Sequence, residues 1–353
     1  MSRISFFEAL NLFKYASLED LRVLAARTRE FLNPGNRVFF IVDANPNYTN
    51  ICTVHCRFCA FHRNVTHPEA YLLTIDELRE KLITYRDAGV RTVLLQGGIH
   101  PKVSFDYLKS ILEMTVNEFP ELHPHYFSAI EISSAATVSG ISVKQALSIL
   151  KDCGQTTIPG GGAEILSEKV RLKISPKKMK LNGWIDFHKQ AHKLGFLTTA
   201  TMMFGHLETA EDVIIHLDTL RQSQDETSGF SAFIPWSYKS PNTPMKKLVS
   251  QKSSADFYYR ILAISRIYLD NFPHIAASWF GEGKEVGKRG LHYGADDFGG
   301  TILNESVHKS AEWDLTASKE EIIQMIETEG FVPIERNSFY RPVLTTSALQ
   351  EQR

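Results

Sequence analysis

Short apolar runs and amphipathic stretches alternate along most of this 353-residue chain. Eight of the apolar runs show no strict alternation with polar residues, which is typical of parallel strands buried on both faces. We therefore predict strands at residues 37–43, 91–96, 125–130, 156–158, 197–204, 230–234, 275–279 and 298–302. Helical periodicity predicts helices between them, at residues 75–88, 105–119, 143–152, 184–194, 210–224, 255–271 and 284–292. Thr74 and Glu77 form a capping box at the first of these helices, and Gly89 follows its end.

Eight strands that are each followed by a helix predict a (β/α)₈ barrel rather than an open doubly wound sheet. Residues 6–31 read as two helices that precede the barrel, and residues 319–328 read as a C-terminal helix. We expect one domain, with N-terminal helices at 1–36, the barrel at 37–305 and a C-terminal extension at 306–353. Chemistry in such a barrel lies at the carboxyl ends of the strands.

Charge and composition argue against nucleic-acid-binding, membrane-spanning and secreted proteins. The chain has 39 basic and 40 acidic residues, so bulk electrostatic binding of nucleic acid is not expected. No apolar run approaches the roughly 18 residues that a membrane span needs. Glu8 and Lys14 interrupt the N-terminal apolar stretches, so we predict no signal peptide. These features predict a soluble, cytoplasmic protein with no membrane partner.

Three of the four cysteines lie within eight positions, in the long connection after the first predicted strand. Cys52, Cys56 and Cys59 are spaced Cys-x3-Cys-x2-Cys, and three thiolates on one loop can hold three irons of a cubane cluster. Zinc is the alternative, with His55 or His62 as the fourth ligand, although no second cysteine pair exists. Cys153 stands alone and is expected to be a small buried apolar residue.

Glycines and carboxylates follow the next predicted strands. Gln96-Gly97-Gly98 ends the second strand, where glycines let a ligand approach the backbone, although a Gly-Gly pair in isolation is usually a plain turn. Glu131 follows the third strand, where an unpaired buried carboxylate is costly. It either contacts a ligand, or it faces water or pairs with a lysine. Three glycines and then Glu164 follow the fourth strand.

Three more candidate site residues each have a structural role as the alternative to a functional one. Arg171 lies seven residues beyond Glu164 and either contacts a ligand or is a solvated helix residue. His206 follows the fifth strand and is able to take a proton, but a lone histidine there is more often structural. Trp236 follows the sixth strand and either stacks on a substrate ring or packs in the core.

The cysteine loop, with Phe58 immediately before its last cysteine, resembles the signature of the radical S-adenosylmethionine enzymes. The resemblance runs over nearly the whole chain. Segments 47–52, 59–61, 96–101 and 158–166 resemble the futalosine-pathway and deazaflavin-synthase group. Phe233-Ile-Pro-Trp236, followed by Pro241-Asn242-Thr243, is most similar to the dehypoxanthine futalosine cyclases of menaquinone biosynthesis. Aminofutalosine synthases tend to differ at that segment.

This resemblance implies a [4Fe–4S] cluster on the three cysteines, with S-adenosylmethionine at the open iron. The implied contacts of S-adenosylmethionine are Phe58, Gln96, Gly97, Gly98, Glu131, Ser133 and Arg171. The implied reaction removes hydrogen from the ribose of dehypoxanthine futalosine, joins the sugar radical to the benzoate ring, and ends with loss of an electron and a proton. His206 and Glu164 are the candidates for taking that proton, and Trp236, Asn242, Thr243 and Asp296 are the candidate substrate contacts.

The resemblance has two local departures. Ala44-Asn45-Pro46-Asn47 stands where these enzymes usually have a segment like Arg-Asn-Ile-Asn, which affects the approach to the cysteine loop. Gly294-Ala-Asp296-Asp297 stands where they usually have Gly-Ala-Asn-Asp, which we expect to add a carboxylate near the mouth of the barrel.

Three interpretations remain. The first is the cyclase, reduced by a donor such as flavodoxin or ferredoxin. The second is a sister enzyme, either an aminofutalosine synthase or a deazaflavin synthase subunit. The third is a non-catalytic iron–sulfur electron carrier or zinc module.

Overall fold

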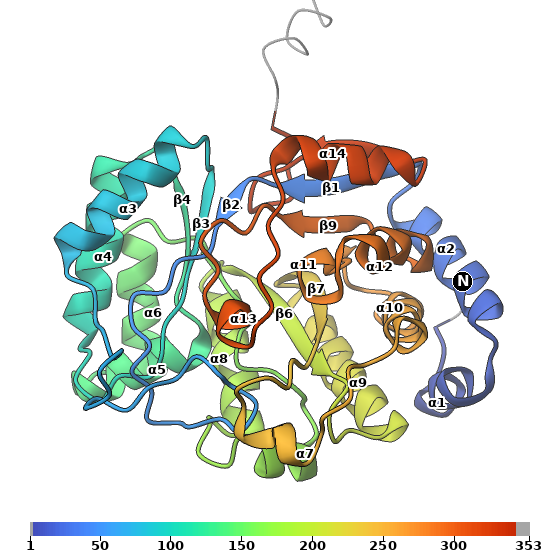
Figure 1. Cartoon of the computed structure of the whole chain (residues 1–353), viewed down its shortest axis with the longest axis horizontal. Coiled ribbons are helices and arrows are strands. Elements are labelled where there is room, and N and C mark those ends of the chain that lie inside the picture. Colours follow the sequence, from blue (N-terminus) through green and yellow to red (C-terminus); the bar gives the residue numbers. More distant parts are fainter. Residues whose placement is uncertain (1–2, 344–353) are drawn as a thin grey trace, which may run out of the picture.

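A computed structural model describes residues 3–343 of the chain. Its strands run parallel to one another, with helices around them (Figure 1). The strands are β1 Arg37–Ile41, β2 Asp43–Ala44, β3 Thr92–Leu95, β4 His123–Tyr126, β5 Thr157–Ile158, β6 Leu197–Phe204, β7 Phe230–Ser237, β8 His274–Ile275, β9 Asp297–Gly300 and β10 Val332–Glu335. The α-helices are α1 Phe6–Tyr15, α2 Leu18–Leu32, α3 Ile75–Asp87, α4 Phe105–Glu118, α5 Ala129–Val138, α6 Val143–Asp152, α7 Glu168–Ile174, α8 Leu181–Lys193, α9 Ala210–Thr227, α10 Ala255–Tyr268, α11 Trp279–Glu282, α12 Lys284–Arg289, α13 Val307–Ser310 and α14 Lys319–Thr328. Two 3₁₀ turns are η1 Pro244–Lys247 and η2 Gly290–Tyr293.

The strands form two hydrogen-bonded sheets that together make the barrel. Seven strands pair in the order β2-β3-β4-β5-β6-β7-β8, and three pair in the order β10-β1-β9. Parallel bridges link Ala44 to Leu303 and Ala276 to Asp297, so β9 joins β8 on one side and the β1–β2 region on the other. The α/β barrel predicted from the sequence is confirmed, with its helical extensions.

The predicted strands at 125–130 and 275–279 were wrong at their ends. The first ends at Tyr126, because Ser128 is the N-cap of α5 and Glu131 completes a capping box with it. The second ends at Ile275, and α11 begins at Trp279. In both places an apolar run continues from a strand into a buried helix, and periodicity does not separate the two in so short a run.

The sequence analysis also missed β10, which pairs with β1 from Arg37↔Val332 to Phe40↔Glu335. Pro333 lacks a backbone N–H, which argues against a strand, yet β10 lies at a sheet edge, where proline is tolerated. Helix α14 lies at the top of Figure 1 and packs against β10. The C-terminal extension predicted at 306–353 is described to residue 343, and its remainder lies outside the described residues.

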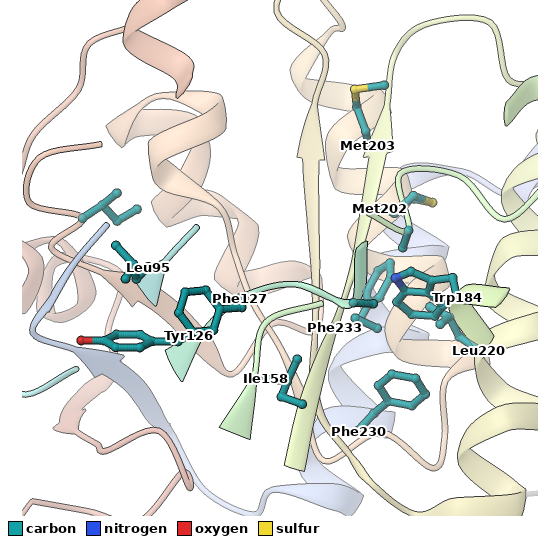
Figure 2. Packing of buried hydrophobic residues seen from close by; sticks show 14 of the residues in the cluster. Leu95, Tyr126, Phe127, Ile158, Trp184, Met202, Met203, Leu220, Phe230 and Phe233 are labelled. Atoms are coloured by element: carbon teal, nitrogen blue, oxygen red, sulfur yellow. The ribbon is translucent and has the colours of Figure 1, made fainter. Parts of the chain in front are cut away.

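Aromatic and aliphatic side chains from the strands and outer helices pack into one core (Figure 2). Trp184 of α8 stacks on Phe230 of β7, with ring centroids 6.0 Å apart and planes 9° from parallel. Phe230 in turn stacks on Phe272 at 5.5 Å. This continuous cluster runs from α1 to α14 and packs beneath the strand ends, and the single domain stays a prediction. Within residues 3–343, none of the helices has both the length and the apolar character that crossing a bilayer requires.

Candidate active site at the mouth of the barrel

Backbone hydrogen bonds tie the cysteine loop to connections that follow three different strands. Thr53 N–H donates to Ile99 O, beyond β3, at 3.0 Å. Arg57 N–H donates to Ile174 O at the end of α7 at 2.8 Å, and Met245 N–H of η1 donates to Arg57 O at 2.9 Å. The loop therefore spans the carboxyl side of the barrel, where the chemistry of this fold is found.

Two of the three thiols, those of Cys56 and Cys59, lie in an environment that favours a metal cluster. Burial raises the pKa of Cys56 to about 12 and raises that of Cys59. Such thiols carry protons by themselves, and a positive group such as iron is required to keep them as thiolates. Cysteine thiolates are the ligands that iron–sulfur clusters take, and a cubane binds each thiolate at a separate iron.

A zinc site at this loop gains no support from the geometry. The rings of His55 and His62 pack edge to face at 5.1 Å, and His62 Nδ1 lies 3.0 Å from Cys59 O. Within the described part of the chain, no three His, Cys, Asp or Glu side chains are gathered as ligands of a single metal ion. Cys153 is half-buried at the end of α6, where its Sγ lies 3.9 Å from Glu113 Oε1.

The Gly-Gly segment after β3 packs directly against the residues that lead into the cysteine loop. A Cβ atom at Gly98 would lie 2.3 Å from Ile51 O and 3.0 Å from Cys52 Cβ. A Cβ atom at Gly97 would lie 2.8 Å from the ring of Tyr48. The two glycines are therefore required for close packing of the loop, in addition to any ligand that approaches their backbone.

Glu131 is buried in the first turn of α5 and holds the Gly-Gly segment in place. Its Oε1 accepts from Gly97 N–H at 2.8 Å, and its Oε2 accepts from Ser128 N–H at 2.8 Å. Burial raises the pKa of Glu131 to about 7, although these hydrogen bonds oppose the rise. Two residues on, Ser133 Oγ is buried and has no hydrogen-bond partner among the described residues, so a bound ligand would supply one.

A buried ion pair that the sequence did not predict lies beside the cysteine loop. Glu164, after β5, pairs with Lys178, and both side chains are buried. Lys178 Nζ lies 5.3 Å from the ring centre of Phe58, and its charge opposes the rise in the pKa of Cys56 that burial causes. Burial lowers the pKa of Lys178 itself, but the neighbouring Glu164 raises it above its ordinary value. Lys178 therefore stays charged next to the thiols.

Arg171 is buried rather than solvated. Its guanidinium donates to Gly162 O at 3.1 Å and to Met179 O at 2.6 Å, so it holds the glycine turn after β5 against the segment that carries Lys178. A Cβ atom at Gly161 would lie 2.6 Å from Gln96 Nε2, which shows that the glycine turn and the Gln96 segment are in contact. The predicted contacts of Gln96, Glu131, Ser133, Phe58 and Arg171 with S-adenosylmethionine stay predictions, but these residues do lie around one loop.

His206 is fully buried, and both of its ring nitrogens face local groups. Nε2 lies 3.0 Å from Met203 O, and Nδ1 accepts from Leu207 N–H at 2.7 Å. Glu208 Oε2 also lies 3.0 Å from Nδ1. The proposed proton acceptor therefore has no ring nitrogen that is free of the surrounding chain.

Trp236, Asn242 and Thr243 lie at and beyond the end of β7. The ring of Trp236 meets that of His308 on α13 edge to face at 5.6 Å. Asn242 Nδ2 donates to Ser310 O at 3.1 Å, and Thr243 Oγ1 donates to Ser240 O at 2.8 Å. Trp236 and Asn242 thus contact the segment that follows β9, whose helix α13 lies near the centre of the molecule (Figure 1). Thr243 bonds within its own loop.

Asp296 does not lie near the mouth, so that prediction was wrong. It immediately precedes β9 and lies beside His274 at the start of β8, at the amino-terminal ends of the strands. The side chain is fully buried and pairs with Arg266 and with His274 Nδ1 at 2.6 Å. Burial raises the pKa of Asp296, but the charge of Arg266 and the hydrogen bond from His274 hold it below its ordinary value. The side chain is a structural anion under the barrel.

Comparisons with known proteins agree with this geometry. Residues 46–220 match the radical SAM superfamily, and residues 227–348 match the CofH/MqnC C-terminal region. The cyclic dehypoxanthine futalosine synthase of Halalkalibacterium halodurans is 37% identical over 97% of this chain and 92% of that protein. The 5-amino-6-(D-ribitylamino)uracil–L-tyrosine 4-hydroxyphenyl transferase of Methanocaldococcus jannaschii is 38% identical over 96% of each.

The fold is shared with more distant enzymes of known structure. The FeFe-hydrogenase maturase HydG from Carboxydothermus hydrogenoformans superposes with a TM-score of 0.74 at 17% identity, covering 96% of this chain and 78% of that one. Methylornithine synthase (PylB) superposes with a TM-score of 0.71 at 18% identity over 94% of each chain. Because relatives more than a third identical match nearly its whole length, the chain belongs to the CofH/MqnC family of radical SAM enzymes, whose cofactors are a [4Fe–4S] cluster and S-adenosylmethionine.

Proposed function

We propose that the protein is a cyclic dehypoxanthine futalosine synthase that acts in menaquinone biosynthesis. The observation that carries the proposal is the segment from Phe233 to Trp236, which resembles the cyclases and which ends β7 at the mouth of the barrel. The relative from Halalkalibacterium halodurans, which has that activity in its name, matches this chain over nearly its full length and supports the same choice.

Cys52, Cys56 and Cys59 would hold the cluster, and backbone groups of Gly97 and Gly98 with Ser133 Oγ would bind S-adenosylmethionine. Together these cofactors supply a 5′-deoxyadenosyl radical that removes hydrogen from the ribose. The chain contributes position and exclusion of water. Lys178 balances the negative charge of the thiolates and of Glu164, and Glu131 fixes the backbone of Gly97.

Trp236 is the proposed stacking partner of the benzoate ring, which must lie over the sugar for the ring to close. Asn242 and Thr243 act through the loop, because their side chains already bond to Ser310 and Ser240. For the last proton we prefer Glu164 to His206, because Lys178 holds the carboxylate of Glu164 through one oxygen, whereas both ring nitrogens of His206 face the surrounding chain.

The deciding experiment uses anaerobically reconstituted enzyme with dithionite, or with flavodoxin or ferredoxin, as the electron source. Dehypoxanthine futalosine should yield a product that has lost two hydrogen atoms, together with 5′-deoxyadenosine and methionine. A parallel reaction contains tyrosine and 5-amino-6-(D-ribitylamino)uracil, the substrates named for the transferase relatives, which match this chain equally well. Product in the parallel reaction alone would replace the cyclase by the transferase.

Trp236→Ala tests the substrate contact. Cyclised product should fall at least tenfold, because the ring would no longer be held over the sugar, while uncoupled formation of 5′-deoxyadenosine should stay within about twofold. Mass spectrometry measures both. Normal cyclisation by this variant would remove the main support for the cyclase.

A further inference from the structure

A cavity of 440 Å³ lies between helix α3 and the segment 302–316 that follows β9. Asn47, which leads into the cysteine loop, lines one side, and His308 of α13 lines another. Lys81 of α3 closes a third side. The volume suits a small organic ligand, and the cavity adjoins the mouth of the barrel because His308 also contacts Trp236.

The cavity wall carries polar groups that lack hydrogen-bond partners in the protein. Among residues 3–343, neither ring nitrogen of His308 has such a partner, although Nδ1 lies 3.6 Å from Glu305 Oε2, and Asn47 Oδ1 has none either. Within the same residues Lys81 makes no ion pair or side-chain hydrogen bond, although its charge helps to lower the pKa of Glu77, one turn earlier on α3. Buried polar atoms are nearly always satisfied in folded proteins, so groups like these point to a ligand that satisfies them.

His308 is held so that its ring is able to present a nitrogen to the cavity. Its ring packs edge to face against Trp236 at 5.6 Å and against Phe280 at 5.5 Å. The side chain is 15% exposed, and since both nitrogens are buried, the exposed atoms are carbons. A half-turn about the Cβ–Cγ bond exchanges carbon and nitrogen positions without disturbing either aromatic contact.

The acidic residues of the cavity are already engaged. Glu305 accepts from the backbone N–H groups of Val307 and His308 at 2.7 and 2.8 Å. Asp314 pairs with Lys309 at 3.0 Å. Lys309 balances the charge of Asp314, and the two backbone N–H groups hold the Glu305 carboxylate at the start of α13. Lys81 and His308 Nε2 then supply hydrogen-bond donors to the cavity, which suits an anion such as a carboxylate.

We propose that this cavity binds the carboxylate of the aromatic ring of the substrate, through Lys81 and His308. The inference rests on the proposed function, because dehypoxanthine futalosine presents a benzoate at one end and a sugar at the other. With the carboxylate in the cavity, the ring lies beside Trp236 and the sugar extends toward the cysteine loop.

His308→Phe is the first test, because it keeps the aromatic packing and removes both nitrogens. The KM for dehypoxanthine futalosine, and its Kd measured by calorimetry on unreduced holoenzyme, should rise about tenfold, while kcat changes less than threefold. His308→Gln restores a donor and should recover part of the loss. His292→Phe, which removes a partly exposed histidine outside the cavity, is the control and should match wild type.

Lys81→Met is the second test and is paired with a change in the ligand. A substrate analogue with a carboxamide in place of the carboxylate should bind wild-type enzyme about tenfold more weakly than the substrate. In Lys81→Met the two ligands should bind within twofold of each other, because the charge that distinguishes them is gone. Lys144→Met, on the exposed side of α6, is the matched control.

The outcomes separate the two proposals. Suppose that wild type converts dehypoxanthine futalosine, that His308→Phe leaves Kd and KM unchanged, and that Lys81→Met still binds the carboxylate more tightly than the carboxamide. These results together would overturn the cavity assignment and leave the proposed function standing. Failure of wild type to convert or bind that substrate overturns the proposed function, and the assignment of its carboxylate falls with it.

Discussion

At the scale of single residues, the site depends on charged side chains that the fold buries. Lys178 and Glu164 are both buried, so the attraction between their charges offsets the free-energy cost of removing each one from water. The adjacent thiols have raised pKa values through burial, and only a positive group turns them into ligands. Two neighbouring lysines in a polar stretch, Lys177 and Lys178, look alike in the sequence. Only the folded chain shows that one is exposed and the other is not.

Removal of single cysteines tests the cluster. Cys52→Ala, Cys56→Ala and Cys59→Ala should each lose most of the bound iron and the charge-transfer absorbance, since each removes a thiolate. Cys153→Ala should keep both, because Cys153 lies on α6, away from the loop. Loss of iron in Cys153→Ala with retention in Cys56→Ala would contradict the assignment.

Lys178→Met should destabilise the protein by about 3–5 kcal/mol, because it leaves the carboxylate of Glu164 buried without a partner. Thermal unfolding measures this loss. The double variant Lys178→Met/Glu164→Gln should recover most of the stability, and Lys177→Met, at the exposed neighbour, should change little. Equal melting temperatures for Lys178→Met and Lys177→Met would show that the pair contributes nothing.

At the scale of elements, the site depends on close approaches between connections that follow different strands. The end of β3 packs on the entrance to the cysteine loop through Gly98, and the turn after β5 meets Gln96 through Gly161. Arg171 of α7 holds that turn by hydrogen bonds to the carbonyl oxygens of Gly162 and Ala163. These contacts explain why glycines recur at the strand ends even where no ligand touches them.

Gly98→Ala tests this packing. The added Cβ atom would collide with Ile51 O, which is backbone and cannot move without shifting Cys52. Iron content after reconstitution should fall several-fold while the far-ultraviolet circular dichroism stays that of wild type. Gly183→Ala, in helix α8, where the nearest neighbour is a methionine side chain at 3.2 Å, is the control. Full iron loading in Gly98→Ala would show that the loop tolerates displacement.

At the scale of the whole molecule, the last described strand closes the bottom of the barrel. Strand β10 pairs with β1, and Arg336 just beyond it forms a buried ion pair with Asp297 at the start of β9. The guanidinium also lies 3.9 Å from the ring centre of Tyr340, which stacks on His274 at 4.0 Å. The C-terminal segment thus joins the first and last strands of the barrel at the end opposite the cysteine loop.

Arg336→Met should therefore lower the stability of the whole barrel by about 3–5 kcal/mol, since Asp297 would be left buried and unpaired. The free energy of unfolding from denaturant titration is the measurement. Arg341→Met is the control, because the guanidinium of Arg341 lies 6.0 Å from the ring centre of Phe339, and its hydrogen bonds with Asn337 are made by its backbone. If Arg336→Met and this control had the same free energy of unfolding, the C-terminal segment would not stabilise the barrel.

Local rules accounted for most of the elements. The sequence predicted α14 at its observed bounds and α3 to within one residue, because capping boxes at Ser318 and Thr74 mark their starts. Strand β6 also matched its apolar run. Errors arose where one apolar run served two elements, as at α5 and α11, and at β10, whose pairing with β1 joins residues about 300 positions apart.

The sequence by itself determined the barrel, the cysteine loop and the family, because each rests on residues close together in the chain: strand and helix periods, and three thiols within eight positions. The tertiary structure alone decided which polar residues share an environment. It placed Asp296 beneath the barrel with Arg266, buried Lys178 beside Cys56, and left the nitrogens of His308 without hydrogen-bond partners among residues 3–343. Burial and pairing depend on residues that are distant in sequence, so periodicity and spacing carry no information about them.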